Sequence, residues 1–218
     1  MGLSAHYCYF ESVRDDPDGL AWAEEKLSEV NYVLRANGLR EHVEKPAELP
    51  PHTYRCQLGS IGWSWLHCLR RLYALTLQNS DAAGWRPVPA PQDYPGPDLD
   101  PVIDKELFVF IRSHLIVHSD SEGWYVPVDF EDILTGDGTI EPPGGLLGSS
   151  PRLLGELRDV APWLGIALDS EGGLDDQAAA RLADATEDDP WHREKYAWLH
   201  LFEAARLSVE LGTAVVFC

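Results

Sequence analysis

The chain has 218 residues, of which 36 are acidic and 17 are Lys or Arg, so its formal net charge at pH 7 is −19. A charge of this sign disfavours nucleic acid and anionic membranes as partners, because like charges repel one another. The length is enough to bury a core without disulfides or a metal ion, and we expect a single domain over residues 1–218.

The first part of the chain predicts one strand and two helices. Residues 3–10 are rich in aromatic side chains, which is typical of a strand. Residues 17–37 predict an amphipathic helix that begins with a proline and ends before a glycine. Its apolar residues recur at intervals of three and four, namely Leu20, Ala23, Leu27, Val30 and Leu34. Residues 61–78 predict a second helix, because they also carry a single apolar stripe.

The middle of the chain predicts a hairpin between long loops. Residues 79–101 are rich in proline and predict an irregular connection, and residues 101–112 are compatible with a helix. Residues 115–118 and 124–128 predict two strands, joined by a turn of five residues that contains a glycine. Residues 129–150 predict a further loop, which ends in a glycine-rich stretch.

The last part of the chain predicts three helices and a terminal strand. One helix begins at Ser150-Pro151, a short one covers residues 176–185, and a long one ends before Gly212. Residues 213–217 are rich in β-branched side chains and predict a strand. The predicted fold class is therefore α+β, with a small mixed sheet of N- and C-terminal strands and a central hairpin, packed by four to five helices.

The predicted hairpin carries candidate metal ligands. On a strand, His114 and His118 share one face, and acidic residues follow them on the connecting turn and beyond it. Two imidazoles together with carboxylates are ligands that zinc and iron accept. The candidate metal site comprises His114, His118, Asp120, Glu122 and Asp129. The alternative is that the acidic residues are turn formers and the histidines are hydrogen-bonded within the fold.

Two further patterns predict anion binding. Residues 144–152 place glycines before a helix N-terminus that carries Ser149, Ser150 and Arg152, a combination that can bind an anion. On the helix predicted at 61–78, three basic side chains lie close together and could hold a phosphate or carboxylate ligand, namely His67, Arg70 and Arg71. The alternatives are an ordinary helix cap in the first case and ion pairs with surface acids in the second.

The chain has no feature of an exported or membrane-inserted protein. Residues 1–10 lack the basic start of a signal peptide, and no apolar run reaches the length that spans a membrane. The cysteines at positions 8, 56, 68 and 218 form no C-x-x-C pair. We therefore expect a cytoplasmic protein with reduced thiols.

The segment HSDSEGWYVPVDF, at residues 118–130, resembles a segment of uncharacterised bacterial proteins of similar length. Residues 66–74, 147–154 and 204–210 resemble further segments of these proteins, so the resemblance spans most of the chain. It implies a discrete single domain and carries no activity with it.

The charge and the lack of a complete catalytic motif favour an acidic interaction protein. We expect it to bind a basic protein partner, in the manner of bacterial immunity or regulatory proteins, because an acidic surface steers basic partners. The alternative is a metal- or anion-binding enzyme, with zinc or iron as the candidate cofactor. Its pocket would be built from the hairpin at 114–129 and the glycine-rich loop at 144–152.

Overall fold

The computed structural model describes residues 2–44, 55, 60–79, 82–94, 96, 100–104 and 112–217. The strands in these ranges are short, and the helices vary from one turn to 20 residues. The strands are β1 (Gly2–Leu3), β2 (Ala5–Tyr7), β3 (Ile61–Gly62), β4 (Gly123–Val126), β5 (Leu147–Ser149) and β6 (Val215–Phe217). The helices are α1 (Tyr9–Ser12), α2 (Pro17–Ala36), α3 (Trp63–Gln78), α4 (Pro101–Asp104), α5 (Ser150–Val160), α6 (Asp176–Ala183) and α7 (His192–Leu211), with 3-10 turns at Pro143–Gly145 and Ala161–Leu164.

Four strands form a mixed sheet in the order β2-β6-β4-β5. The β6 strand is antiparallel to both β2 and β4, whereas β5 runs parallel to β4. The β1 and β3 strands form a separate antiparallel pair. A mixed sheet that joins both ends of the chain, with helices packed around it, confirms the predicted α+β class.

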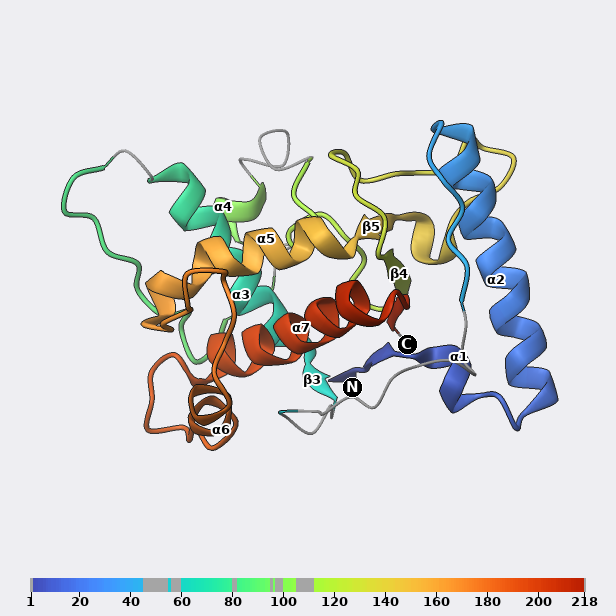
Figure 1. The fold of residues 1–218 in the computed structure, drawn as a ribbon. Coiled ribbons are helices and arrows are strands. Elements are labelled where there is room, and N and C mark those ends of the chain that lie inside the picture. The colour runs from blue at the N-terminus through green and yellow to red at the C-terminus, as the bar shows by residue number, and fades with distance from the viewer. Residues whose placement is uncertain are drawn as a thin grey trace.

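Helices cover both faces of the mixed sheet. Successive residues of β4 point to opposite sides, so Tyr125 packs with the helices α3, α5 and α7 while Trp124 packs with α2. Figure 1 shows α2 on one side of β4 and β5, and the other long helices on the opposite side. Every residue of β4 is buried, because neither face of the sheet is open to water.

The long helices begin and end near the predicted residues. The N-cap of α2 is Asp16, whose Oδ1 accepts a hydrogen bond of 3.2 Å from the backbone N–H of Asp18. The α7 helix ends at Leu211, and Gly212 follows it with a φ of 73°, a left-handed conformation that glycine adopts without strain. The strand predicted over residues 3–10 is shorter than expected, because Phe10 lies in α1.

The predicted hairpin does not form, because residues 115–118 make turns rather than a strand. Their backbone groups bind buried side chains instead of a neighbouring strand. Glu156 accepts hydrogen bonds from the backbone N–H groups of His114 and Leu115, at 2.9 and 2.6 Å. Arg70 donates to the carbonyl oxygens of Leu115 and His118, at 2.8 and 2.6 Å. These side chains hold the backbone in a shape that no hydrophobic pattern specifies.

Two sequence predictions fall partly outside the described residues. The helix expected over residues 101–112 is described at Pro101–Asp104, and residues 105–111 lie outside the described ranges. The cysteines at positions 8 and 68 are buried and free, whereas those at positions 56 and 218 lie outside.

Candidate functional site

Acidic residues outnumber Lys and Arg by 36 to 17, and several of these few cations are engaged inside the protein. Arg70 is 5% exposed and Arg193 is 9% exposed. Both donate to backbone carbonyl oxygens, Arg70 to that of His118 and Arg193 to that of Ala90. These two guanidinium groups are therefore not available for ion pairs with the acidic side chains at the surface.

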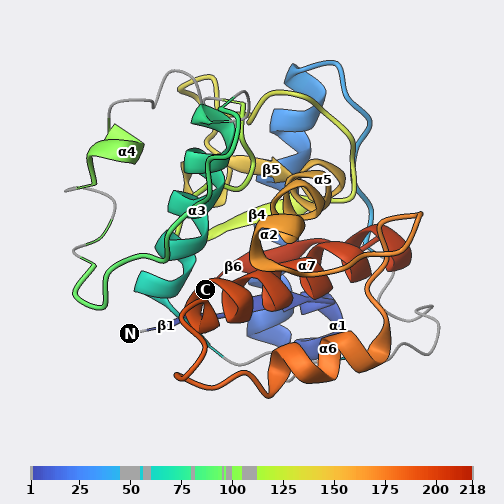
Figure 2. The same cartoon turned by 90° about the vertical axis from the view of Figure 1, so that its left-hand side faces the viewer.

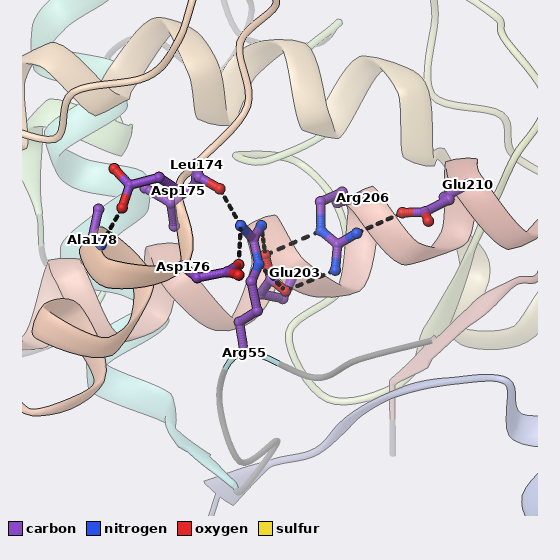
Figure 3. Close-up of polar contacts among 8 residues, drawn as sticks. All are labelled: Arg55, Leu174, Asp175, Asp176, Ala178, Glu203, Arg206 and Glu210. Carbon is purple, nitrogen blue, oxygen red and sulfur yellow. Dashed lines mark hydrogen bonds and ion pairs between the residues drawn. The ribbon is translucent and has the colours of Figure 1, made fainter. Parts of the chain in front are cut away.

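Two more arginines are engaged by one buried carboxylate on α7, as Figure 3 shows. The side chain of Glu203 is fully buried between Arg55 and Arg206. Arg55 Nε lies 3.1 Å from Glu203 Oε2, and Arg206 Nη2 lies 3.0 Å from the same atom. Burial alone would raise the pKa of Glu203, but hydrogen bonds from the two guanidinium groups outweigh it and lower that pKa. Glu203 therefore stays ionised and binds both arginines.

The same cluster attaches the segment that leads into α6. Arg55 donates to the carbonyl oxygen of Leu174, and its Nη1 lies 3.6 Å from Asp176 Oδ1. Asp175 then caps α6 by accepting a hydrogen bond of 2.8 Å from the backbone N–H of Ala178 (Figure 3). The start of α6 is thus held by charged and capping contacts.

Two separate regions each carry several acids at the surface. The first, the α2 face, combines one side of α2 with neighbouring loop acids and consists of the exposed Asp18, Glu25, Glu122 and Asp137 and the partly exposed Glu29. The second, the α6 lobe, surrounds α6 and consists of Asp169, Glu171, Asp175, Asp184, Glu187 and Asp188. Figure 1 places α2 and α6 at opposite ends of the molecule, and Figure 2 shows α6 alongside α7.

Contacts across the α2 face join the helix to the loop acids. Lys26 donates to Glu29 at 2.7 Å, and this hydrogen bond raises the pKa of Lys26, with Glu122 adding a smaller electrostatic contribution. The hydroxyl of Tyr32 donates to Asp137 Oδ2 at 2.8 Å. These contacts place acids from two loops beside the acids of α2.

Backbone hydrogen bonds fix several of these carboxylates in place. Asp137 accepts from the backbone N–H of Thr139 at 2.9 Å, and Asp169 accepts from those of Glu171 and Gly173 at 2.8 Å. These hydrogen bonds lower the pKa of both aspartates. Their negative charges are therefore held at defined positions.

The structure does not bring the five candidate metal ligands together. The prediction needed a strand face shared by His114 and His118, and that strand is absent. Asp129 pairs with Arg152 at 2.5 Å, Asp120 pairs with His67 at 2.9 Å, and Glu122 is exposed on the α2 face. Within the described ranges, no three His, Cys, Asp or Glu side chains are grouped so as to hold a metal ion.

Both histidines are instead buried among protein groups. His114 Nδ1 accepts a hydrogen bond of 2.9 Å from the backbone N–H of Ser149. The ring of His118 stacks on Tyr125, with ring centroids 3.9 Å apart. Burial lowers the pKa of each histidine to about 4, so both are neutral at pH 7.

The basic patch on α3 faces the protein rather than solvent. His67 and Arg70 are each 5% exposed, and Arg71 is only partly exposed. Arg71 Nε lies 3.0 Å from Asp100 Oδ2, whereas His67 and Arg70 contact the segment that follows Arg112, as described above. That these three residues bind an anion stays a prediction, and in the structure each already has a protein partner.

The glycine-rich loop at 144–152 caps α5. Ser149 Oγ accepts a hydrogen bond of 3.4 Å from the backbone N–H of Arg152, and the hydroxyls of Ser150 and Ser208 lie 2.6 Å apart. Both Ser149 and Ser150 are fully buried. Arg152 binds both carboxylate oxygens of Asp129, at 2.5 and 3.2 Å. The geometry favours the cap interpretation, and anion binding by these residues stays a prediction.

Sequence reasoning missed Glu156, the partly buried carboxylate that holds residues 113–115. Burial raises the pKa of Glu156 to about 7, against three hydrogen bonds that lower it. It lines a cleft of ≈ 610 Å³, and the other lining residues include Arg112 and three of the candidate site residues, His114, Asp129 and Arg152. Glu156 stands at an ordinary polar position of an amphipathic helix, so the sequence contains no signal that marks it. The acidic stretch between Arg112 and Arg152, which has no Lys or Arg, is a signal that could have been used for the α2 face.

No helix in the described part of the chain combines the length and the apolar character that crossing a membrane requires. No curated protein and no solved structure gives a significant match to the chain. A family model does match, over residues 1–217, and its description is "Putative DNA-mimic protein".

This match overturns the immunity- or regulator-like interpretation, which is wrong. A protein that imitates DNA presents its acidic surface to proteins that bind DNA. The expected partner, a basic protein of no particular class, is corrected in the same way to a DNA-binding protein. The match covers nearly the whole sequence and is consistent with the expected membership of an uncharacterised family. The chain therefore belongs to the family of putative DNA-mimic proteins.

Proposed function

We propose that this protein acts as a DNA mimic, whose surface carboxylates occupy the DNA-binding site of a DNA-binding protein and so compete with DNA. The observation that carries the proposal is the family match over residues 1–217. The net charge of −19 and the carboxylates fixed by backbone hydrogen bonds support it. A binding site built for phosphates accepts carboxylates through the same charge-assisted hydrogen bonds from Arg and Lys.

The α2 helix supplies a row of acidic residues to the α2 face. An α-helix rises about 1.5 Å per residue, so Asp18, Glu25 and Glu29 stand at steps of about 10 Å and 6 Å on one side of α2. Duplex DNA carries about one negative charge per 1.7 Å of its axis, which is a denser array. The loop acids of the α2 face lie beside this row and raise the local charge density.

Mimicry of this kind predicts which features of binding resemble those of DNA. The carboxylates can replace phosphate contacts, but they present no base edges, so competition should not depend on the sequence of the DNA. Because the contacts are charged and exposed, binding should weaken as salt is added. Both features distinguish mimicry from a complex that is built on apolar contacts.

The test is displacement from immobilised DNA. DNA-binding proteins of the host are loaded on DNA-cellulose and washed with this protein at constant ionic strength, and a released protein is identified and purified. Polyglutamate at equal total charge is the control for charge alone. Release of specific proteins by this chain and not by polyglutamate supports the proposal, whereas equal release by both reagents, or none, contradicts it.

A further inference from the structure

An exposed aromatic cluster lies at the N-terminal end of the α2 face. Trp22 is 40% exposed, although tryptophan side chains are mostly buried in folded proteins. Its ring packs edge-to-face against Tyr9, with ring centroids 5.6 Å apart, and Tyr9 packs in the same way against His6 at 6.2 Å. We call these three residues the aromatic ledge. Figure 1 shows α1, which begins at Tyr9, beside the N-terminal end of α2.

Acidic side chains flank the exposed tryptophan along the helix. Asp18 stands four residues before Trp22 and Glu25 three residues after it, so all three lie on one side of α2. Asp18 is exposed, and its neighbour Asp16 is held by its cap hydrogen bond. The site therefore places the indole surface of Trp22 between two negatively charged carboxylates.

We propose that the aromatic ledge receives an arginine side chain from the DNA-binding surface of the partner. This inference rests on the proposed function, which supplies a partner that contacts DNA through basic residues. The guanidinium group stacks on Trp22 while its N–H groups bind Asp18 or Glu25. Arginine fits this site better than lysine, because its planar and weakly hydrated cation stacks on aromatic rings and binds carboxylates through two parallel hydrogen bonds.

The ledge also adds what a purely acidic surface lacks. Exposed carboxylates steer a basic partner and speed its association, but each exposed ion pair adds little to affinity. Tryptophan is among the residues that carry most binding energy at interfaces, because one side chain buries a large area. The α2 face thus combines steering charges with an anchor for one side chain.

A second exposed tryptophan provides a matched control. Trp63 is 44% exposed, similar to Trp22, and it lies at the first position of α3. Its Nε1–H group donates to the carbonyl oxygen of Asp120 at 2.7 Å. Replacing either tryptophan removes an exposed indole of similar accessibility, but only Trp22 belongs to the ledge.

The experiment compares labelled nona-arginine and nona-lysine peptides as probes, by fluorescence anisotropy at fixed ionic strength. The wild-type protein should bind nona-arginine more tightly, and Trp22→Ala should weaken nona-arginine binding by about 2- to 5-fold, the range of an exposed cation–π contact. Nona-lysine binding should change less. Trp63→Ala should leave the ratio of the two affinities as it is in the wild type. Trp22→Phe should keep part of the preference for nona-arginine over nona-lysine that Trp22→Ala loses.

Circular dichroism confirms that each variant is folded before its binding is measured. An unchanged arginine preference in folded Trp22→Ala overturns the proposal, and so does an equal loss in Trp63→Ala. Trp22→Phe decides the outcome if the alanine variant does not fold, because loss of the preference in the phenylalanine variant would also count against stacking. These results are separate from the DNA-displacement test. If the wild-type protein competes with DNA but the Trp22 variants keep its arginine preference, the proposed function stands and only the proposal for the aromatic ledge is overturned.

Discussion

The α2 face and the α6 lobe are both acidic, but they are built differently. The α2 helix has 20 residues and packs directly on the sheet. Four of its own residues are buried in this contact, namely Ala23, Val30, Val33 and Leu34. The α6 helix has eight residues, of which Ala179 is buried, and its start is held by Arg55 and by the cap of Asp175. Charge alone therefore does not distinguish the two regions. What distinguishes them is the length of the helix that carries the charges and the exposed aromatic cluster that lies beside α2.

The largest expected effect comes from breaking the buried charge cluster that supports the α6 lobe. Glu203→Ala leaves Arg55 and Arg206 without their buried anion, and removing one partner of a buried ion pair costs about 3 to 5 kcal/mol. Because both arginines reach solvent in part, at 13% and 24% exposure, we expect a loss of about 2 to 3 kcal/mol. Urea unfolding measures this loss.

The matched control for this substitution is Glu210→Ala. Glu210 pairs with the same Arg206 but is 58% exposed, so its removal should cost less than about 0.5 kcal/mol. A loss of similar size in both variants would show that burial of Glu203 is not what matters.

The next effect compares the charges of the two acidic regions directly. Asp18→Asn with Glu25→Gln removes two charges from the α2 face, and Asp184→Asn with Glu187→Gln removes two from the α6 lobe. We expect the first pair to weaken binding to a displaced DNA-binding protein by about 10-fold and the second by about 2-fold, because clustered charges that meet a complementary partner dominate steering. Binding kinetics at two salt concentrations measure both, and a reversed order would move the proposed contact to the α6 lobe.

The histidines between the two regions predict how stability changes with pH. The folded-state pKa values of His114 and His118 are lowered to about 4 from an ordinary value of 6.5. The unfolded chain therefore binds more protons than the folded protein between these values, so stability is fully present above pH 6.5 and is lost as the pH falls toward 4. Unfolding measured at pH 7, 5.5 and 4 tests the direction. NMR titration of each imidazole then shows which histidine causes the change in stability. If either ring titrates near 6.5 in the folded protein, the prediction is wrong for that histidine.

The smallest effect concerns the helix caps at the two regions. Asp175→Ala and Asp16→Ala each remove a carboxylate that accepts from the first turn of a helix, at a cost of about 1 kcal/mol. Since α6 has eight residues, of which one is buried, we expect Asp175→Ala to increase amide hydrogen exchange within α6 alone. Asp16→Ala should leave amide hydrogen exchange at the buried residues of α2 unchanged. Equal local exchange in the two helices would contradict the difference in anchoring.

The parts of the fold that follow from local patterns were predicted well. Apolar spacing placed α2, α3 and α7 within a few residues, and the fold class followed from the order of the elements. The failed hairpin at 115–118 has a physical cause, because Glu156 and Arg70 take up backbone groups that a strand would use. Such contacts join residues far apart in the sequence and leave no periodic signal.

The candidate sites were harder to predict than the fold. The sequence placed histidines and acids close together along the chain, but their side chains point to different partners once the turn at 115–118 forms. The net charge was visible from the start, whereas the position of each acid on the surface depends on the fold. The burial of Arg70, Arg193 and Glu203 was not predictable either, because burial of a charged side chain is not readable from composition.

The most direct test of the central claim is a competition titration with a purified DNA-binding protein that this chain displaces. The apparent dissociation constant of that protein for a fluorescent DNA duplex is measured at rising concentrations of the chain and at constant salt. Mimicry predicts that this constant rises in proportion to the added chain without reaching a plateau, for duplexes of unrelated sequence alike. A plateau, or a complex that holds DNA and the chain together on one partner, would contradict the account.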